Sequence, residues 1–110
     1  MELTLSTREV GGNSVVEASG EVDVYTAPQL DEELTKIVEG GNYKLVVDLT
    51  KVDFLDSTGL GVLVKALKRV REHDGTLAIV ATTDRITKVF RITGLDSVMT
   101  LHASVDAATA

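Results

Sequence analysis

Val46 to Gly61 reads V-V-D-L-T-K-V-D-F-L-D-S-T-G-L-G, an apolar run followed by a polar step that contains two glycines. The residues before the step form a continuous apolar pattern, typical of a strand covered on both faces. These residues are Leu45, Val46, Val47 and Leu49. The residues after it recur at the spacing of one helix face, and they are Leu63, Val64, Leu67 and Val70. The segment therefore predicts a buried strand, a loop and a helix that begins close to Ser57.

A pair of strands is predicted at the start of the chain. Leu3 and Leu5 alternate with polar residues, and a second run with apolar residues spans 14–19. Gly11-Gly12-Asn13 lies between the two runs and is a turn signal. We therefore expect an antiparallel hairpin.

The remaining elements alternate between helix and strand. Thr26-Ala27-Pro28 is typical of a helix start, with Thr26 as the cap, and predicts a helix over 27–39. Other expected elements are strands at 43–49, 76–81 and 98–101, helices at 57–72 and 83–92, and weak helical character at 105–110. This order predicts a single α/β domain over residues 1–110, with a mostly parallel sheet, an antiparallel N-terminal edge hairpin and three to four helices.

Composition excludes several classes of function. The net charge of -6 argues against binding to nucleic acid, which usually needs a basic surface. The chain has no cysteine, so disulfides and thiolate chemistry are excluded. No run approaches the roughly 18 apolar residues that span a bilayer, and no apolar leader follows Met1. We therefore expect a cytoplasmic protein without membrane association.

Ser57 is the residue to which chemistry is most readily assigned. It lies where a parallel strand delivers the chain to a helix, the place where α/β proteins tend to bind ligands. Its hydroxyl is suited to act as a helix cap, a nucleophile or a phosphate acceptor. In the structural interpretation, Asp56 or Ser57 only caps the helix, and Gly59 and Gly61 allow close packing against the sheet.

Enzymatic and cofactor functions find little support in the sequence. A serine hydrolase needs a base near Ser57, but His73 lies at the far end of the same predicted helix, about 24 Å away. His102 is the only other histidine, and the G-x-S-x-G elbow is absent. No phosphate-binding loop, dinucleotide fingerprint or metal-ligand spacing is present. We therefore expect no catalytic residue, no metal site and no cofactor.

The sequence resembles the anti-sigma factor antagonists of the STAS superfamily. The resemblance rests on the Val46 to Gly61 segment, on G-E-V-D-V-Y-T-A-P-Q-L at Gly20 to Leu30 and on F-R-I-T-G-L at Phe90 to Leu95. With the matching order of elements, it covers essentially the whole chain. It implies the STAS fold for this domain.

The resemblance also implies a phosphorylation switch. In that family the serine matching Ser57 is phosphorylated by an anti-sigma factor that is itself a serine kinase. The unphosphorylated form binds this kinase and releases its sigma factor, and a phosphatase restores that form after phosphorylation. Residues matching Asp23 and Asp56 flank the phosphoacceptor. The expected partner-binding residues are Asp23, Asp56, Ser57, Thr58, Gly59, Leu60 and Val62.

A second hypothesis keeps the fold and changes the function. The chain would be a scaffold or accessory STAS protein of a signalling assembly or a transporter, with Ser57 as a structural helix cap. The two hypotheses differ in the task that they give to the Ser57 hydroxyl. A pull-down that retrieves subunits of an assembly and no kinase would favour the second.

Overall fold

The computed structural model describes residues 2–110 as one mixed sheet with helices on its faces. The strands are β1 (Leu3–Val10), β2 (Asn13–Val22), β3 (Lys44–Leu55), β4 (Thr76–Val80) and β5 (Thr100–His102). The helices are α1 (Ala27–Glu39), α2 (Ser57–Arg71), α3 (Asp84–Ile92), the 3-10 turn η1 (Leu95–Ser97) and α4 (Val105–Thr109).

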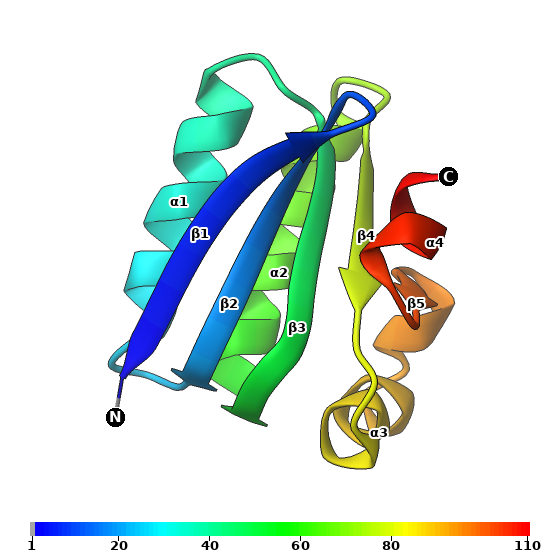
Figure 1. Ribbon diagram of the computed structural model, residues 1–110. Coiled ribbons are helices and arrows are strands. Elements are labelled where there is room, and N and C mark those ends of the chain that lie inside the picture. The colour runs from blue at the N-terminus through cyan, green and yellow to red at the C-terminus, as the bar shows by residue number, and fades with distance from the viewer. Residues whose placement is uncertain (1) are drawn as a thin grey trace.

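The sheet has the order β1-β2-β3-β4-β5, so neighbours in the chain are neighbours in space. Strands β1 and β2 pair antiparallel, and all other pairs are parallel. The expected α/β class, the edge hairpin and the parallel remainder are therefore confirmed. Helices α1 and α2 lie side by side behind the sheet in Figure 1, and both begin at the lower edge, where β2 and β3 end.

Two apolar clusters hold the layers together. The larger one lies between the sheet and α1, α2 and α3, and it contains the fully buried Leu30, Leu63 and Phe90. The smaller one contains Val15, Val46 and Val80, with α4 packed against it. Because β3 contributes alternate residues to both clusters, it is buried on both faces.

Strand β3 differs from expectation, since it continues to Leu55 instead of ending at residue 49. Its extension pairs with an extended β2, in the register Gly20↔Val52 and Val22↔Leu55, and the register shifts along the way. The apolar pattern weakens here because only one face of this part is buried, so exposed Lys51 and Asp53 interrupt it.

The last strand begins later than expected. A strand was expected at 98–101, and β5 spans Thr100–His102, after the 3-10 turn η1 at Leu95–Ser97. Gly94 adopts a positive φ of 75°, and the turn that it opens occupies the next residues. Strand β5 begins only when the chain reaches β4, where Ala78 pairs with Thr100.

The two glycines of α2 are predicted to respond oppositely to alanine. A Cβ on Gly59 would lie 2.6 Å from Leu55 Cδ1 and 2.6 Å from Val22 Cγ1, whereas one on Gly61 meets nothing within 4 Å. We expect Gly59→Ala to lower the free energy of unfolding by about 1–3 kcal/mol through overpacking. Gly61→Ala should raise it by about 0.5–1 kcal/mol, because alanine loses less backbone entropy in a helix.

Urea denaturation of both variants checks this pair. If Gly59→Ala and Gly61→Ala changed the free energy of unfolding by the same amount in the same direction, the predicted difference in packing would be contradicted. The sequence-based expectation that both glycines pack closely against the sheet is thus correct for Gly59 and wrong for Gly61, which faces open space.

Within residues 2–110, no helix combines the length and the apolar character that crossing a membrane requires.

Candidate functional site

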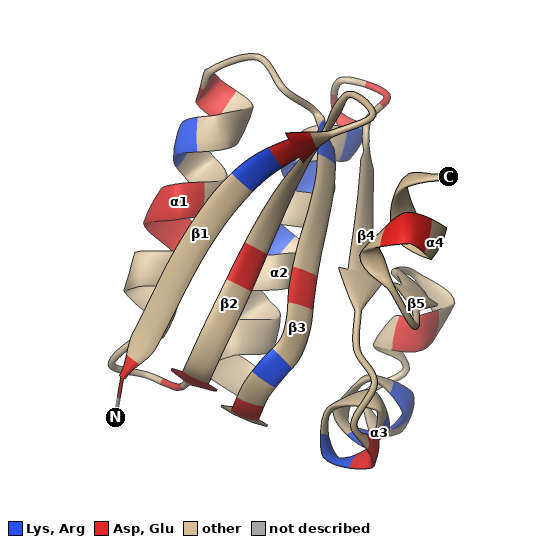
Figure 2. Cartoon of the chain, in the orientation of Figure 1, with Lys and Arg blue, Asp and Glu red and all other residues tan. Residues whose placement is uncertain are grey.

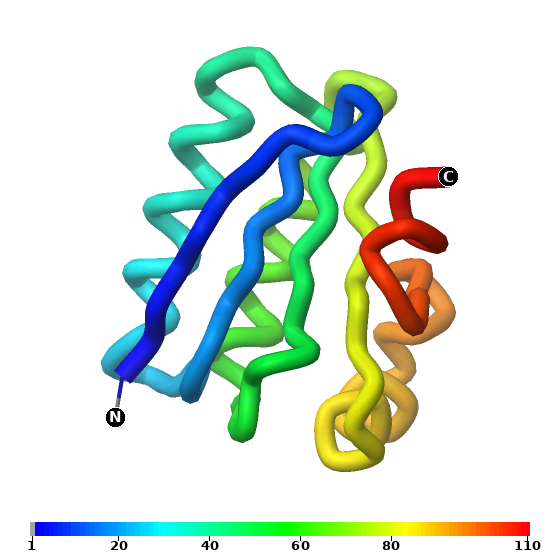
Figure 3. Tube along the Cα trace, in the orientation of Figure 1, coloured from blue at the N-terminus to red at the C-terminus, as the bar shows by residue number. Residues whose placement is uncertain are grey.

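The site is built where three segments meet at the edge of the sheet at which its parallel strands end. These are the β2–α1 loop from Asp23 to Thr26, the end of β3, and the first turn of α2 with Ser57. Figure 3 shows the turns into α1 and α2 at the same lower edge of the molecule. The Asp56 N–H donates to the Val22 carbonyl over 3.2 Å and ties the two turns together.

Asp56 is the N-cap of α2. It has extended backbone angles, and its Oδ1 accepts from the N–H groups of Thr58 (3.0 Å) and Gly59 (3.2 Å). Ser57 is therefore the first residue inside the helix, and the assignment of Ser57 as a structural cap is wrong. Its side chain is exposed at the positive end of the helix dipole.

The β2–α1 loop is fixed by the side chains of Asp23 and Thr26. Asp23 Oδ1 accepts from the N–H groups of Tyr25 (2.9 Å) and Thr26 (3.0 Å). The Thr26 hydroxyl donates to the Glu21 carbonyl (2.7 Å) and accepts from the Asp23 N–H (2.9 Å). Thr26 makes no side-chain cap bond to α1, contrary to expectation, because its hydroxyl is used within the loop.

Asp23 is 5% exposed, so the structure places this expected contact beneath the surface. Its Oδ2 is buried and has no hydrogen-bond partner among residues 2–110. Burial raises the pKa of this carboxyl. The hydrogen bonds from Thr26 and Tyr25 outweigh that effect and hold the pKa below its ordinary value of 3.8.

A lowered pKa predicts that Asp23 makes stability depend on pH. Its contribution is fully present above pH 3.8, the ordinary value, and is lost as the pH falls through the lower pKa of the folded state. Asp23→Asn removes this titration. We expect the wild-type protein to be more stable than the variant at pH 7, with a smaller advantage at pH 3. Urea denaturation at both pH values measures the gap, and a gap that does not change would contradict the prediction.

The other expected contacts divide between surface and core. Ser57 and Thr58 are exposed, Asp56 and Val62 are half-buried, and Leu60 is 6% exposed in the main core. Gly59 is also buried, against Val22 and Leu55. Helix periodicity turns Gly59 and Leu60 toward the sheet, so the Leu60 side chain is packed in the core and is not exposed to a partner.

Neither histidine lies near Ser57. His73 stacks on Tyr43 with ring centroids 4.0 Å apart, at the opposite end of α2. His102 lies level with Asp48 in the sheet, because His102 pairs with Val80 and Val80 pairs with Asp48. From Asp48, strand β3 continues for about 20 Å before α2 begins, so His102 is far from Ser57. No group of three or more His, Cys, Asp or Glu side chains within residues 2–110 is arranged to hold a metal ion.

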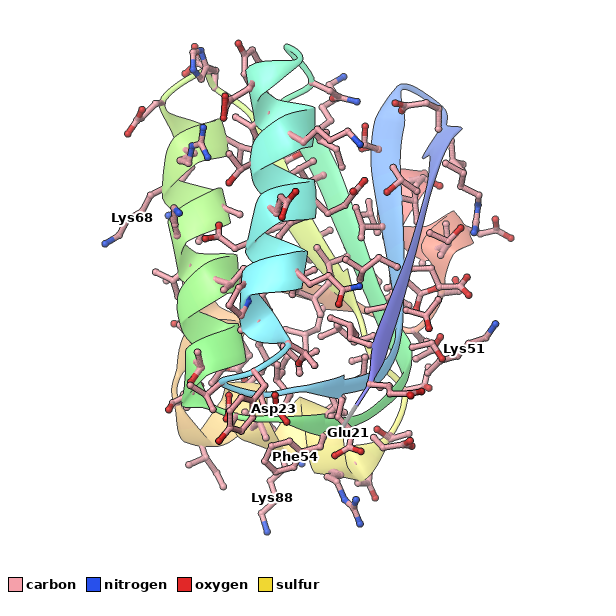
Figure 4. The ribbon with its side chains drawn as sticks, turned by 90° about the vertical axis from the view of Figure 1, so that its left-hand side faces the viewer. Glu21, Asp23, Lys51, Phe54, Lys68 and Lys88 are labelled. Atoms are coloured by element: carbon pink, nitrogen blue, oxygen red, sulfur yellow. The ribbon has the colours of Figure 1, made fainter. Side chains whose placement is uncertain are left out.

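The surface around Ser57 is acidic and partly apolar. Figure 2 shows acidic segments at the ends of β2 and β3, and Figure 4 shows Glu21, Asp23 and Phe54 close together at this edge. Sequence reasoning missed the apolar part, in which Tyr25 is 85% and Phe54 41% exposed. An available signal was the apolar pair Val24-Tyr25, which follows Asp23 and directly precedes the predicted helix start at Thr26.

Comparison with known proteins relates this fold to one family. The STAS domain model matches residues 4–108. An anti-sigma-B factor antagonist from Staphylococcus aureus is 38% identical over 106 residues, which cover 96% of this chain and 98% of that protein.

Solved structures agree with this match. The crystal structure of an anti-sigma factor antagonist from Mycobacterium paratuberculosis is 33% identical, with a TM-score of 0.90, and the match covers 97% of this chain and 91% of that one. The fold is shared with the anti-sigma factor antagonist SpoIIAA in its unphosphorylated form, at 18% identity and a TM-score of 0.80, over 94% of this chain and 92% of that one.

Proposed function

Because this chain belongs to the STAS domain family, we propose that it is an anti-sigma factor antagonist switched by phosphorylation of Ser57. The unphosphorylated chain binds an anti-sigma factor, which is a serine kinase, and so releases the sigma factor that the kinase holds. Phosphate on Ser57 ends this binding, and a phosphatase restores it. The chain acts in the cytoplasm and performs no catalysis itself.

The position of Ser57 is the observation that carries the proposal. Its hydroxyl is exposed in the first turn of α2, and the capping role belongs to Asp56. A shallow hollow of about 750 Å³ lies elsewhere, along α1, and Ser57 does not line it. An exposed hydroxyl outside this hollow suits modification by another protein better than chemistry on a small substrate.

The helix end explains how phosphate would change the surface without unfolding the domain. Asp56 already occupies the N–H groups of Thr58 and Gly59. A phosphate on Ser57 therefore stays on the outer side of the helix end, where the dipole tolerates negative charge. It adds about -1.5 to -2 charges beside Asp56 and repels a partner surface that has adapted to the neutral hydroxyl.

Direct mapping of the phosphate tests the proposal. The serine-kinase anti-sigma factors of the organism that makes this chain are purified and incubated with it one at a time in the presence of ATP. Mass spectrometry should locate one phosphate on Ser57, and Thr58→Ala, its matched neighbour, should still be phosphorylated. Phosphate on another residue, with Ser57 always unmodified, would reject the switch.

A further inference from the structure

Exposed apolar side chains gather at the edge that carries Ser57. Five large apolar residues are exposed within residues 2–110, and three of them, Val24 (57%), Tyr25 (85%) and Phe54 (41%), lie at this edge. We call these three residues the aromatic edge. The chain has only four Tyr and Phe residues, and two of them, Tyr25 and Phe54, lie exposed at this edge. Clustered exposure of this kind is typical of a protein-binding surface.

Hydrogen bonds hold the backbone that carries Val24 and Tyr25. Val24 and Tyr25 lie in the loop that Asp23 and Thr26 hold with four hydrogen bonds of 2.7–3.0 Å. The Ala27 N–H also donates to the Asp23 carbonyl over 2.8 Å. Because the backbone is already ordered, binding through this loop costs little conformational entropy.

The aromatic edge and Ser57 lie close together. Phe54 pairs with Glu21 across β2 and β3 and precedes Ser57 by three residues. The Asp56 N–H donates to the Val22 carbonyl over 3.2 Å, which places the residue before Ser57 beside the start of the β2–α1 loop. One partner surface can therefore cover both.

The charges beside the aromatic edge indicate the chemistry of that partner. Glu21, Asp53 and Asp56 supply carboxylates around it, and Asp23 Oδ2 is a buried acceptor without a donor. On the side of α3, Lys88 lies beyond Phe54 in Figure 4, and the neighbouring Arg85 donates to the Asp53 carbonyl over 3.2 Å. A complementary surface is therefore apolar at its centre and basic toward β2 and β3.

We propose that the aromatic edge is the affinity-determining contact for the anti-sigma factor, with Tyr25 inserted in an apolar socket that basic side chains surround. This inference rests on the proposed function and adds to it. Ser57 carries the switch, whereas Tyr25 supplies the binding energy that brings the kinase to the serine. Binding and phosphate transfer are thus divided between neighbouring residues.

Tyr25→Ala tests the inference, with Ile92→Ala as the matched control. Both side chains are exposed, at 85% and 73%, so neither variant should unfold. Calorimetric titration against the anti-sigma factor that phosphorylates the wild-type chain should show Tyr25→Ala binding about thirtyfold more weakly, as expected for a central aromatic anchor. The KM for phosphorylation should rise by a similar factor with kcat unchanged, while Ile92→Ala behaves as wild type.

The outcomes separate this inference from the function on which it rests. If the wild-type chain binds and is phosphorylated on Ser57 but Tyr25→Ala binds equally well, the inference is overturned and the proposed function stands. If none of the anti-sigma factors binds or phosphorylates the wild-type chain, both fail. Equal losses in Tyr25→Ala and Ile92→Ala would also overturn the inference, since the effect would not be specific to this edge.

Discussion

Ser57→Asp is expected to weaken the complex with the anti-sigma factor by about 2 kcal/mol or more, which is roughly thirtyfold in Kd. The new carboxylate stands beside Asp56, in a part of the surface that the partner must desolvate. It cannot take the N–H groups of Thr58 and Gly59, because Asp56 Oδ1 already accepts from both. The charge therefore faces the partner without compensation.

Ser57→Ala should bind as the wild-type chain does and take up no phosphate at all. The substitution removes neither a cap nor a core contact, since Asp56 caps α2 and Ser57 is exposed. Calorimetric titration measures the Kd of Ser57→Asp and of Ser57→Ala for the anti-sigma factor. Thr76→Asp, which places the same charge on an exposed residue at the opposite end of the sheet, is the control and should bind normally. A similar loss in Thr76→Asp would mean that total charge, and not the position of Ser57, governs the complex.

Phe90→Ala should lower the free energy of unfolding by about 3–5 kcal/mol, the usual cost of emptying a fully buried phenylalanine site. Phe90 is completely buried, and with Ile86 it forms the whole buried face of the nine-residue helix α3. The total free energy of unfolding of a domain of this size is about 5–15 kcal/mol. The variant should therefore be marginally stable.

Urea denaturation with Ile92→Ala as the control checks this expectation. Ile92 belongs to the same helix and is 73% exposed, so its removal should change stability by no more than about 0.5 kcal/mol. A loss below about 1 kcal/mol in Phe90→Ala would show that α3 contributes little to the core.

Local signals in the sequence predicted several elements well. Helix α1 has the expected bounds, Ala27 to Glu39, because Pro28 favours the first turn and Gly40-Gly41 stops the helix. Helix α2 begins at Ser57, as the change from apolar run to helical spacing indicated. In both cases the information lies within a few residues of the boundary.

Contacts between distant residues were beyond such signals. The extension of β3 to Leu55 depends on its pairing with β2, since exposed Lys51 and Asp53 break the apolar pattern there. The strand order likewise follows from packing and not from any one segment. Gly59 and Leu60 are buried although both were expected to contact a partner, since motif membership does not reveal which helix face a residue occupies.

The sequence by itself determined the fold class, the family resemblance and the start of α2 at Ser57, because periodicity and motif spacing are local properties of the chain. Only the tertiary structure decided that Asp56 is the cap, that Asp23 holds the β2–α1 loop from within, and that Tyr25 and Phe54 stand exposed beside Ser57. The burial of Asp23 and the exposure of Tyr25 and Phe54 depend on how β2, β3 and α2 pack at one edge, which no single segment contains. The hydrogen bonds of Asp56 and Asp23 join residues two or three positions apart, but each segment offers more than one polar side chain that could form them, and only the folded structure selects one.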